Sequence, residues 1–178
     1  SHNPTGFTMP QDERIRLGHI VSDTRTRTII DESIMDMWTD DAPPAPLAAS
    51  VPRSDLAITI GSMSKSFWGG LRVGWIRAER NTLATIAAIR PSVDLGTPIL
   101  EQLTAARLLE QRDEVLPERR DLLRTRRDHL LTLLQRRLPD WRPGPGRGGI
   151  SLWIRLPAPM STALSASASR LGLDLPAG

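Results

Sequence analysis

Three short apolar segments rich in β-branched residues constrain the fold of this chain most. Residues 26–31 (TRTIID), 56–60 (LAITI) and 72–76 (RVGWI) have the length and composition of buried strands. Helical patterns precede the first segment and follow the third, so the sequence predicts an α/β fold with a mixed, mostly parallel sheet. Because little chain separates the second segment from the third, we expect them to form a hairpin-like or crossing pair at the edge of the sheet.

The rest of the chain is mainly helical in pattern. We expect helices at 10–23, 80–90, 98–111, 115–138 and 161–171. The longest carries a stripe of leucines, and its other face is rich in arginine with acids between, which is typical of a solvated helix face. That arginine set is Arg119, Arg120, Arg124, Arg126, Arg127 and Arg137.

A second, smaller unit is expected in the C-terminal part of the chain. Residues 139–149 form a proline- and glycine-rich break, and 150–156 (ISLWIRL) alternate as a strand does. We therefore divide the chain at residues 1–114 and 115–178, with the long helix opening a small α+β unit. Residues 41–52, rich in proline and alanine, are expected to be a surface loop.

Composition excludes several classes of function. The chain has no cysteine, which excludes thiolate chemistry, and its three histidines lack ligand spacing, so we expect no metal site. The net charge is +3, but the basic residues form no stripe, so the case for nucleic-acid binding is weak. No apolar run approaches the roughly 20 residues of a membrane span, so we expect a soluble cytoplasmic protein. The first and last residues lead us to interpret the chain as a fragment.

The chain contains a single lysine. Of 23 basic residues only Lys65 is not an arginine, and it lies in the stretch 61–75 (GSMSKSFWGGLRVGW). A lysine can lose its proton and condense with an aldehyde, whereas an arginine cannot. A surface lysine without chemistry is the competing interpretation.

Four further polar residues accompany this lysine. Asp31 ends the first predicted strand, and Ser62, Ser64 and Arg72 lie near Lys65. An aldehyde cofactor with a phosphate and a ring nitrogen needs these groups: an amine for the imine, hydroxyls and a guanidinium for the phosphate, and a carboxylate for the protonated nitrogen. The pattern therefore favours pyridoxal 5′-phosphate chemistry.

Three motifs together resemble a known family. The segments 2–6 (HNPTG), 29–32 (IIDE) and 62–75 resemble, in order and approximate spacing, the large-domain signature of class I/II aminotransferases of fold type I. The GGLR spelling, and the segment 146–153 (GRGGISLW), are similar to the branch shared by aminoadipate-type aminotransferases and the MocR-type regulators of the GntR family. In those regulators an aminotransferase-like domain follows an N-terminal winged helix.

The resemblance implies a role for each residue. Lys65 would form the internal aldimine, Asp31 would pair with the pyridine nitrogen, and Asn3 would hydrogen-bond the ring's 3′-oxygen. Ser62 and Arg72 would bind the phosphate with help from Ser64. Taken singly, Asn3 can be a turn former, Asp31 a strand-end cap, Ser62 a loop residue and Arg72 the partner of an acid.

One departure from the family pattern bears on activity. A tyrosine usually follows the aspartate by three residues, but Ile34 stands there and the chain has no tyrosine. A hydrogen bond that tunes the imine is therefore missing, which favours the sensing domain of a MocR-type regulator over a stand-alone amino acid aminotransferase. A domain that binds nothing is the third possibility.

The resemblance also implies partners. We expect an amino acid or amine ligand and a homodimer of the full-length protein. We expect DNA contact only through a winged helix outside this chain, and no contact with a membrane. The fragment alone is expected to be inactive.

Overall fold

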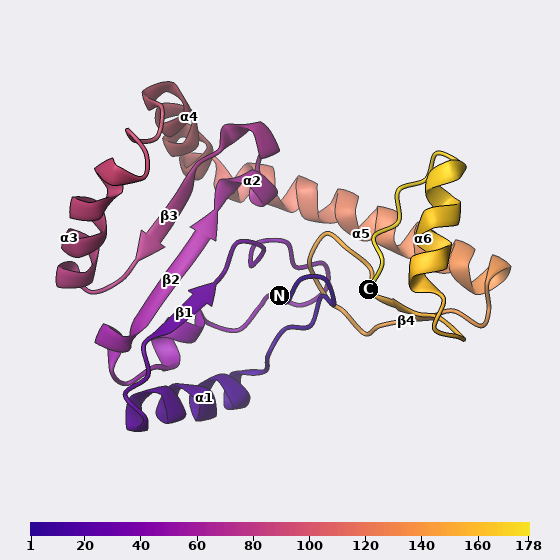
Figure 1. Ribbon diagram of the computed structural model, residues 1–178, viewed down its shortest axis with the longest axis horizontal. Coiled ribbons are helices and arrows are strands. Elements are labelled where there is room, and N and C mark those ends of the chain that lie inside the picture. The colour runs from indigo at the N-terminus through magenta and orange to yellow at the C-terminus, as the bar shows by residue number, and fades with distance from the viewer.

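A three-stranded sheet lies at the centre of the N-terminal part in the computed structural model, which describes residues 1–178 (Figure 1). Its strands are β1 (Thr28–Asp31), β2 (Ala57–Ser62) and β3 (Gly74–Arg77), in that order. β1 runs parallel to β2, and β3 runs antiparallel to β2. The mixed sheet and the edge pair that the sequence predicts are both present, but β3 begins at Gly74 rather than at residue 72.

The two faces of this sheet differ in how well they are covered. Helix α1 (Gln11–Asp23) packs on one face, where Val21, Ile30 and Ala57 belong to one buried cluster. The alternate residues of the strands point to the opposite face. There Ile29 is 68% exposed and Ile76 is 44% exposed. One face of the sheet therefore carries the core, while the other leaves large apolar side chains in contact with solvent.

The segment 41–52 is only in part the surface loop that its composition predicts. It contains a 3₁₀ turn, Leu47–Ser50, which packs on α1, and Val51 is only 5% exposed. Close approach requires glycine on the helix, because a Cβ at Gly18 would overlap the carbonyl oxygen of Ser50. Buried Arg14 adds hydrogen bonds from α1 to the carbonyls of residues 9 and 45.

Three helices follow the sheet. They are α3 (Arg80–Ile89), α4 (Ile99–Glu110) and α5 (Arg112–Arg137), and a 3₁₀ turn, Arg90–Ser92, follows α3. The carboxylate of Glu79 caps α3 by accepting hydrogen bonds from two backbone N–H groups. α5 begins at Arg112 rather than at 115 and passes residue 114 without a break. None of the helices combines the length and apolar character that a membrane span requires.

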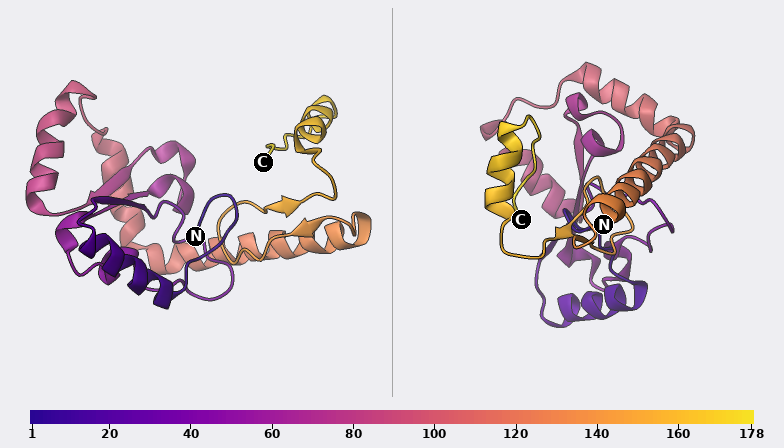
Figure 2. Two further views of the ribbon diagram at one scale, coloured as in Figure 1. Left: turned by 60° about the horizontal axis from the view of Figure 1, so that its bottom comes forward. Right: turned by 90° about the vertical axis from the view of Figure 1, so that its right-hand side faces the viewer.

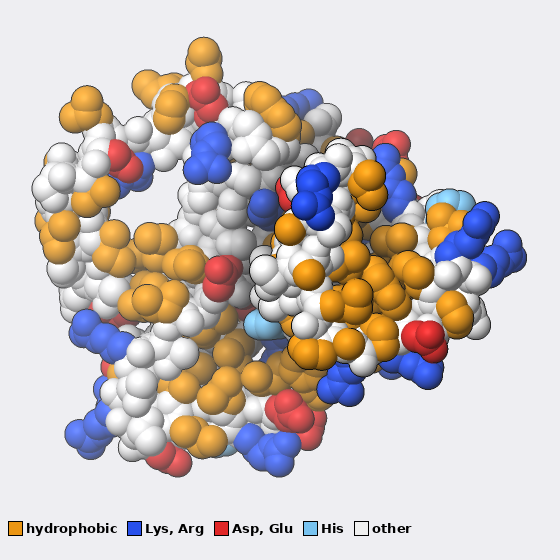
Figure 3. Space-filling view, turned by 45° about the vertical axis from the view of Figure 1, so that its right-hand side comes forward, with side chains coloured by type: hydrophobic (Ala, Val, Ile, Leu, Met, Phe, Trp, Pro, Cys, Tyr) orange, Lys and Arg blue, Asp and Glu red, His pale blue; other side chains and the backbone are white.

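The C-terminal part holds less strand than its alternating sequence predicts. β4 (Arg142–Pro143) and β5 (Ile154–Arg155) form a two-residue ladder, and α6 (Ser161–Arg170) follows. Of the expected strand at 150–156 only residues 154–155 lie in this ladder, although the Trp153 carbonyl accepts a hydrogen bond from the Gly144 N–H at 2.8 Å. Before this strand, Gly149 turns with φ 86° and donates its N–H to the carbonyl of Met37. Figure 2 shows this part beside α5, and Figure 3 shows many hydrophobic side chains at its surface.

Gly18→Ala tests the contact between α1 and the turn at 47–50. Alanine favours a helix over glycine by about 1 kcal/mol, but a side chain forced against backbone costs about 1–3 kcal/mol. We expect the clash to exceed the helix gain, so urea unfolding should show a lower free energy of unfolding. The exposed neighbour variant His19→Ala should stay within about 0.5 kcal/mol of the parent. A stabilised Gly18→Ala variant would contradict the packing described.

Candidate functional site

The single lysine lies on one helical turn that follows the second strand. This turn, α2 (Met63–Ser66), follows β2 directly, and Ser62 caps it by accepting a hydrogen bond from the Ser64 N–H at 3.2 Å. Met63 is 3% exposed and packs in a cluster with Ala105 of α4. Because the buried side chain of Met63 anchors this turn, the backbone of Lys65 is held in a defined place while its side chain stays exposed.

Arg72 lies in a strained turn rather than in a strand. It follows a 3₁₀ turn, Gly69–Leu71, and has φ 52° and ψ 27°, the left-handed region. For a residue other than glycine this conformation costs roughly 1–2 kcal/mol. Complete burial of Leu71 and a hydrogen bond from the Met63 N–H to the Val73 carbonyl (3.0 Å) hold the turn. Arg72 is exposed and lies two residues before Gly74, which pairs with Ser62 at the end of β2.

Asp31 and Ser62 lie at the same edge of the sheet. Asp31 is the last residue of β1 and pairs with Ile60 of β2, two residues before Ser62. In a parallel pair these residues share one face, and neighbouring strands lie about 4.8 Å apart. The carboxylate of Asp31 is exposed and accepts a hydrogen bond only from the Ser33 N–H, at 2.8 Å.

Asn3 lies on a separate turn that the C-terminal part holds in place. The Arg147 N–H donates to the carbonyl of Gly6 at 3.2 Å, and a Cβ on Gly6 would lie 2.5 Å from the Gly148 carbonyl oxygen. This turn lies beyond the tip of β1 (Figure 1). Of the predicted site residues, the sheet edge brings together Asp31, Ser62, Ser64, Lys65 and Arg72, whereas Asn3 comes from this turn.

The charged groups at the sheet edge form no ion pair within the protein. The structure contains nine ion pairs, and none of them includes Asp31, Lys65 or Arg72. An amine, a guanidinium, a carboxylate and two serine hydroxyls are therefore available to a ligand. This donor set fits a phosphorylated aldehyde with a basic ring nitrogen.

The arginines of α5 are only partly a solvated face, which corrects the prediction made from the charge pattern. Arg120 donates to the carbonyl of Asp36 at 2.8 Å, and Arg124 donates to the carbonyl of Thr39 at 2.7 Å. Arg127 makes a two-pronged pair with Asp40 at 2.8 and 3.0 Å. Residues 120, 124 and 127 fall on one helix face, so α5 binds the segment that follows Asp31.

Two of these arginines have shifted pKa values. Burial lowers the pKa of Arg120, and the nearby carboxylate of Asp36 opposes that shift. The hydrogen bond to Asp40 raises the pKa of Arg127. Both guanidinium groups stay charged at neutral pH, since an arginine side chain titrates far above it. The contacts between α5 and residues 36–40 are therefore charge-assisted hydrogen bonds.

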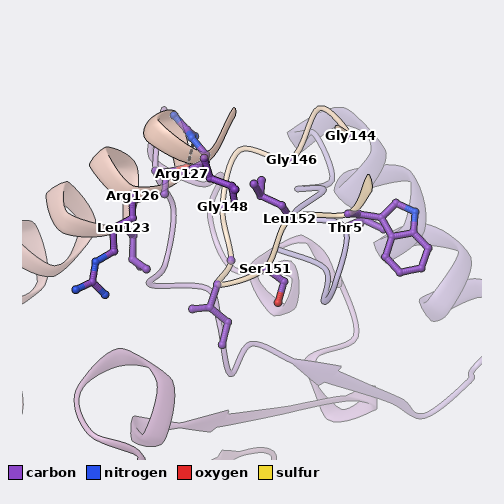
Figure 4. Close-up of a pocket in the computed structure, with 14 residues that line it drawn as sticks. Thr5, Leu123, Arg126, Arg127, Gly144, Gly146, Gly148, Ser151 and Leu152 are labelled. Atoms are coloured by element: carbon purple, nitrogen blue, oxygen red, sulfur yellow. Dashed lines mark hydrogen bonds between the residues drawn. The ribbon is translucent and has the colours of Figure 1, made fainter. Parts of the chain in front are cut away.

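A cavity of about 280 Å³ lies between α5 and the glycine-rich segment 144–149. Figure 4 shows Leu123 and Arg127 from α5 on one side and Gly148 and Leu152 on the other. Thr5 also lines it, but the six predicted site residues do not. The cavity is thus distinct from the sheet edge that carries Lys65.

The structure joins Ser66 and Asp36, two residues for which the sequence predicts no role. The hydroxyl of Ser66 donates to the Asp36 carboxylate at 3.1 Å, and Ser66 is 3% exposed. Ser66 could have been predicted as a site residue, because it directly follows Lys65 in the sequence. No sequence signal marks Asp36, because its contact joins residues 30 positions apart.

Comparison with known proteins shows the family and the fold of the chain. Residues 1–171 match the family model of aminotransferase class I and II, and the chain belongs to that family. It has the aminotransferase fold, with a TM-score of 0.89 to LysN, an α-aminoadipate aminotransferase from Thermus thermophilus solved with N-(5′-phosphopyridoxyl)-L-leucine. That alignment is 28% identical and covers 99% of this chain and 47% of LysN.

Curated relatives fall into two kinds. YisV of Bacillus subtilis, described as an HTH-type transcriptional regulator, is 31% identical over 86% of this chain and 32% of its own length. Aromatic-amino-acid aminotransferase 1 of Thermococcus litoralis is 29% identical over 91% of this chain and 39% of its own. The chain therefore spans a third or slightly more of the length of these relatives.

Arg127→Met tests the contact between α5 and the segment 36–40. The change keeps the apolar stem but removes the hydrogen bonds to Thr39 and Asp40, and hydrogen bonds of charged groups contribute about 1.5–3 kcal/mol. We expect urea unfolding to show a loss within that range. Arg126→Met, at the exposed adjacent position, is the matched control and should change the free energy of unfolding by less than about 0.5 kcal/mol. Equal effects would mean that the face at 127 is solvated after all.

Proposed function

We propose that this chain is the cofactor-binding part of a pyridoxal 5′-phosphate-dependent, aminotransferase-like protein. The observation that carries the proposal is the set of free charged groups at the carboxyl edge of β1 and β2, where ligands bind in open α/β sheets. Family membership supports the cofactor, as does the phosphopyridoxyl ligand named for LysN. The cofactor supplies an electron sink for a carbanion formed on a bound amino compound.

Each residue has a role in this proposal. Lys65 holds the cofactor covalently and, in a transaminating protein, moves a proton. Asp31 keeps the ring nitrogen protonated, and Asn3 donates to the ring's 3′-oxygen. Ser62, Ser64 and Arg72 bind the phosphate, for which a guanidinium and hydroxyls are suitable donors.

We propose further that the whole protein is a MocR-type regulator of the GntR family that senses an amino acid or amine. The regulator-named relative supports this, and so does Ile34, which is 8% exposed and has no hydroxyl to offer the cofactor. The aminotransferase of Thermococcus litoralis favours the second candidate, amino transfer between an amino acid and a 2-oxo acid.

Other properties of the whole protein belong to the same proposal. We propose a homodimer in the cytoplasm that contacts DNA through a winged helix outside this chain. The division of the chain at 1–114 and 115–178 is likewise a proposal, with α5 linking the two parts.

Lys65→Ala tests the cofactor assignment. The intact protein that contains this chain should develop yellow absorbance with pyridoxal 5′-phosphate, because a lysine-bound aldehyde absorbs visible light. The variant should lose that absorbance completely. Lys65→Arg is the matched control for charge and should lose it too, since a guanidinium does not condense with the aldehyde. Unchanged absorbance in either variant would remove Lys65 from the site.

A second measurement separates the regulator from the enzyme. We expect the intact protein to bind duplex DNA from its own upstream region, with affinity that falls as salt rises. We also expect no transamination of common amino acids with 2-oxoglutarate, as followed by the loss and return of the yellow absorbance. Efficient turnover without DNA binding would establish the aminotransferase instead.

A further inference from the structure

A buried serine hydroxyl lies directly beside the lysine of the proposed site. Ser66 closes the helical turn α2 and is 3% exposed, whereas the side chain of Lys65 reaches solvent. The Ser66 hydroxyl donates to the carboxylate of Asp36 at 3.1 Å. The bond ties the turn that carries Lys65 to the segment that follows Asp31.

Asp36 is itself held from a third element. The Arg120 side chain of α5 donates to the Asp36 carbonyl at 2.8 Å, and its guanidinium lies 4.1 Å from the centre of the Trp38 ring. Hydrogen bonding and a cation–π contact together fix this arginine over the segment. The acceptor of the Ser66 bond is therefore held by a long helix rather than by a mobile loop.

The geometry points to Ser66 and Asp36 as positioning residues for Lys65, a role that rests on the proposed function. α2 is a single turn, and an isolated turn has little stability of its own because helix nucleation is unfavourable. Its cap, Ser62, holds only the first end. The Ser66–Asp36 bond holds the second end, so that Lys65 keeps a fixed place relative to Asp31.

A positioning role predicts that loss of the Ser66–Asp36 bond affects hydrogen exchange near Lys65 and cofactor affinity more than it affects the thermal stability of the whole protein. Hydrogen bonds to charged acceptors contribute more than neutral ones, and an amide at position 36 can still accept from the hydroxyl. Asp36→Asn therefore preserves the bond, whereas Asp36→Ala and Ser66→Ala remove it. Ser92→Ala is the control, because the exposed Ser92 hydroxyl bonds only to a nearby backbone carbonyl.

The experiment uses the intact protein that contains this chain and two readouts. The first, without cofactor, is hydrogen–deuterium exchange in the peptide that carries Lys65. The second is the dissociation constant of pyridoxal 5′-phosphate from absorbance titration, together with the pH midpoint of that absorbance. Thermal unfolding of each variant without cofactor reports global stability.

We expect Ser66→Ala and Asp36→Ala each to speed exchange in that peptide and to weaken cofactor binding about tenfold, the loss of one hydrogen bond to a charged group. Both should shift the pH midpoint, while Asp36→Asn and Ser92→Ala stay near the parent. The double variant should resemble either single one, because both changes remove the same bond.

Three results would overturn the inference: unchanged exchange in both alanine variants, additive effects in the double variant, or an Asp36→Asn variant as impaired as Asp36→Ala. If the parent protein binds no cofactor, the proposed function fails, and the exchange readout still decides whether the bond holds the turn.

Discussion

The reversal of the chain between β2 and β3 is the constraint on which the candidate site depends. The Ser62–Gly74 pair and the Met63–Val73 hydrogen bond close it, and the burial of Met63 and Leu71 anchors it. Each such side chain contributes about 1.5–3 kcal/mol when fully buried. Because Met63 and Leu71 are buried and hold the backbone of the reversal, the exposed side chain of Lys65 between them needs no partner within the protein.

The long helix α5 connects this reversal to the C-terminal part of the chain. Its arginines bind carbonyls and a carboxylate in residues 36–40, and the same segment pairs with the glycine-rich stretch through the Trp38–Gly148 bridge. Gly6 packs on that stretch from the N-terminal turn. The segment after Asp31 thus contacts three elements: the lysine turn, the helix α5 and the glycine-rich stretch at 147–149.

Local sequence patterns predict the elements of this fold better than they predict its contacts. The strands at 28–31, 57–62 and 74–77 and the helices follow from periodicity and turn residues, and the grouping of Asp31 with Lys65 follows from strand order. The arginine face of α5 was misjudged, because charge in a sequence does not reveal which carbonyls a helix will meet. The contact of Asp36 with Ser66 also depends on tertiary structure. The same holds for the short ladder at residues 154–155 and for the hydrogen bond from the Gly149 N–H to the Met37 carbonyl.

Two requirements conflict at position 72: the left-handed backbone favours glycine, whereas the proposed binding of an anion needs a cation. Glycine would adopt φ 52° without strain, and replacing arginine by glycine would relieve part of a cost of roughly 1–2 kcal/mol. Glycine, however, offers no cation to an anionic ligand. Arginine at this angle therefore lowers the stability of the fold relative to glycine, and the phosphate-binding role proposed for Arg72 would account for that cost.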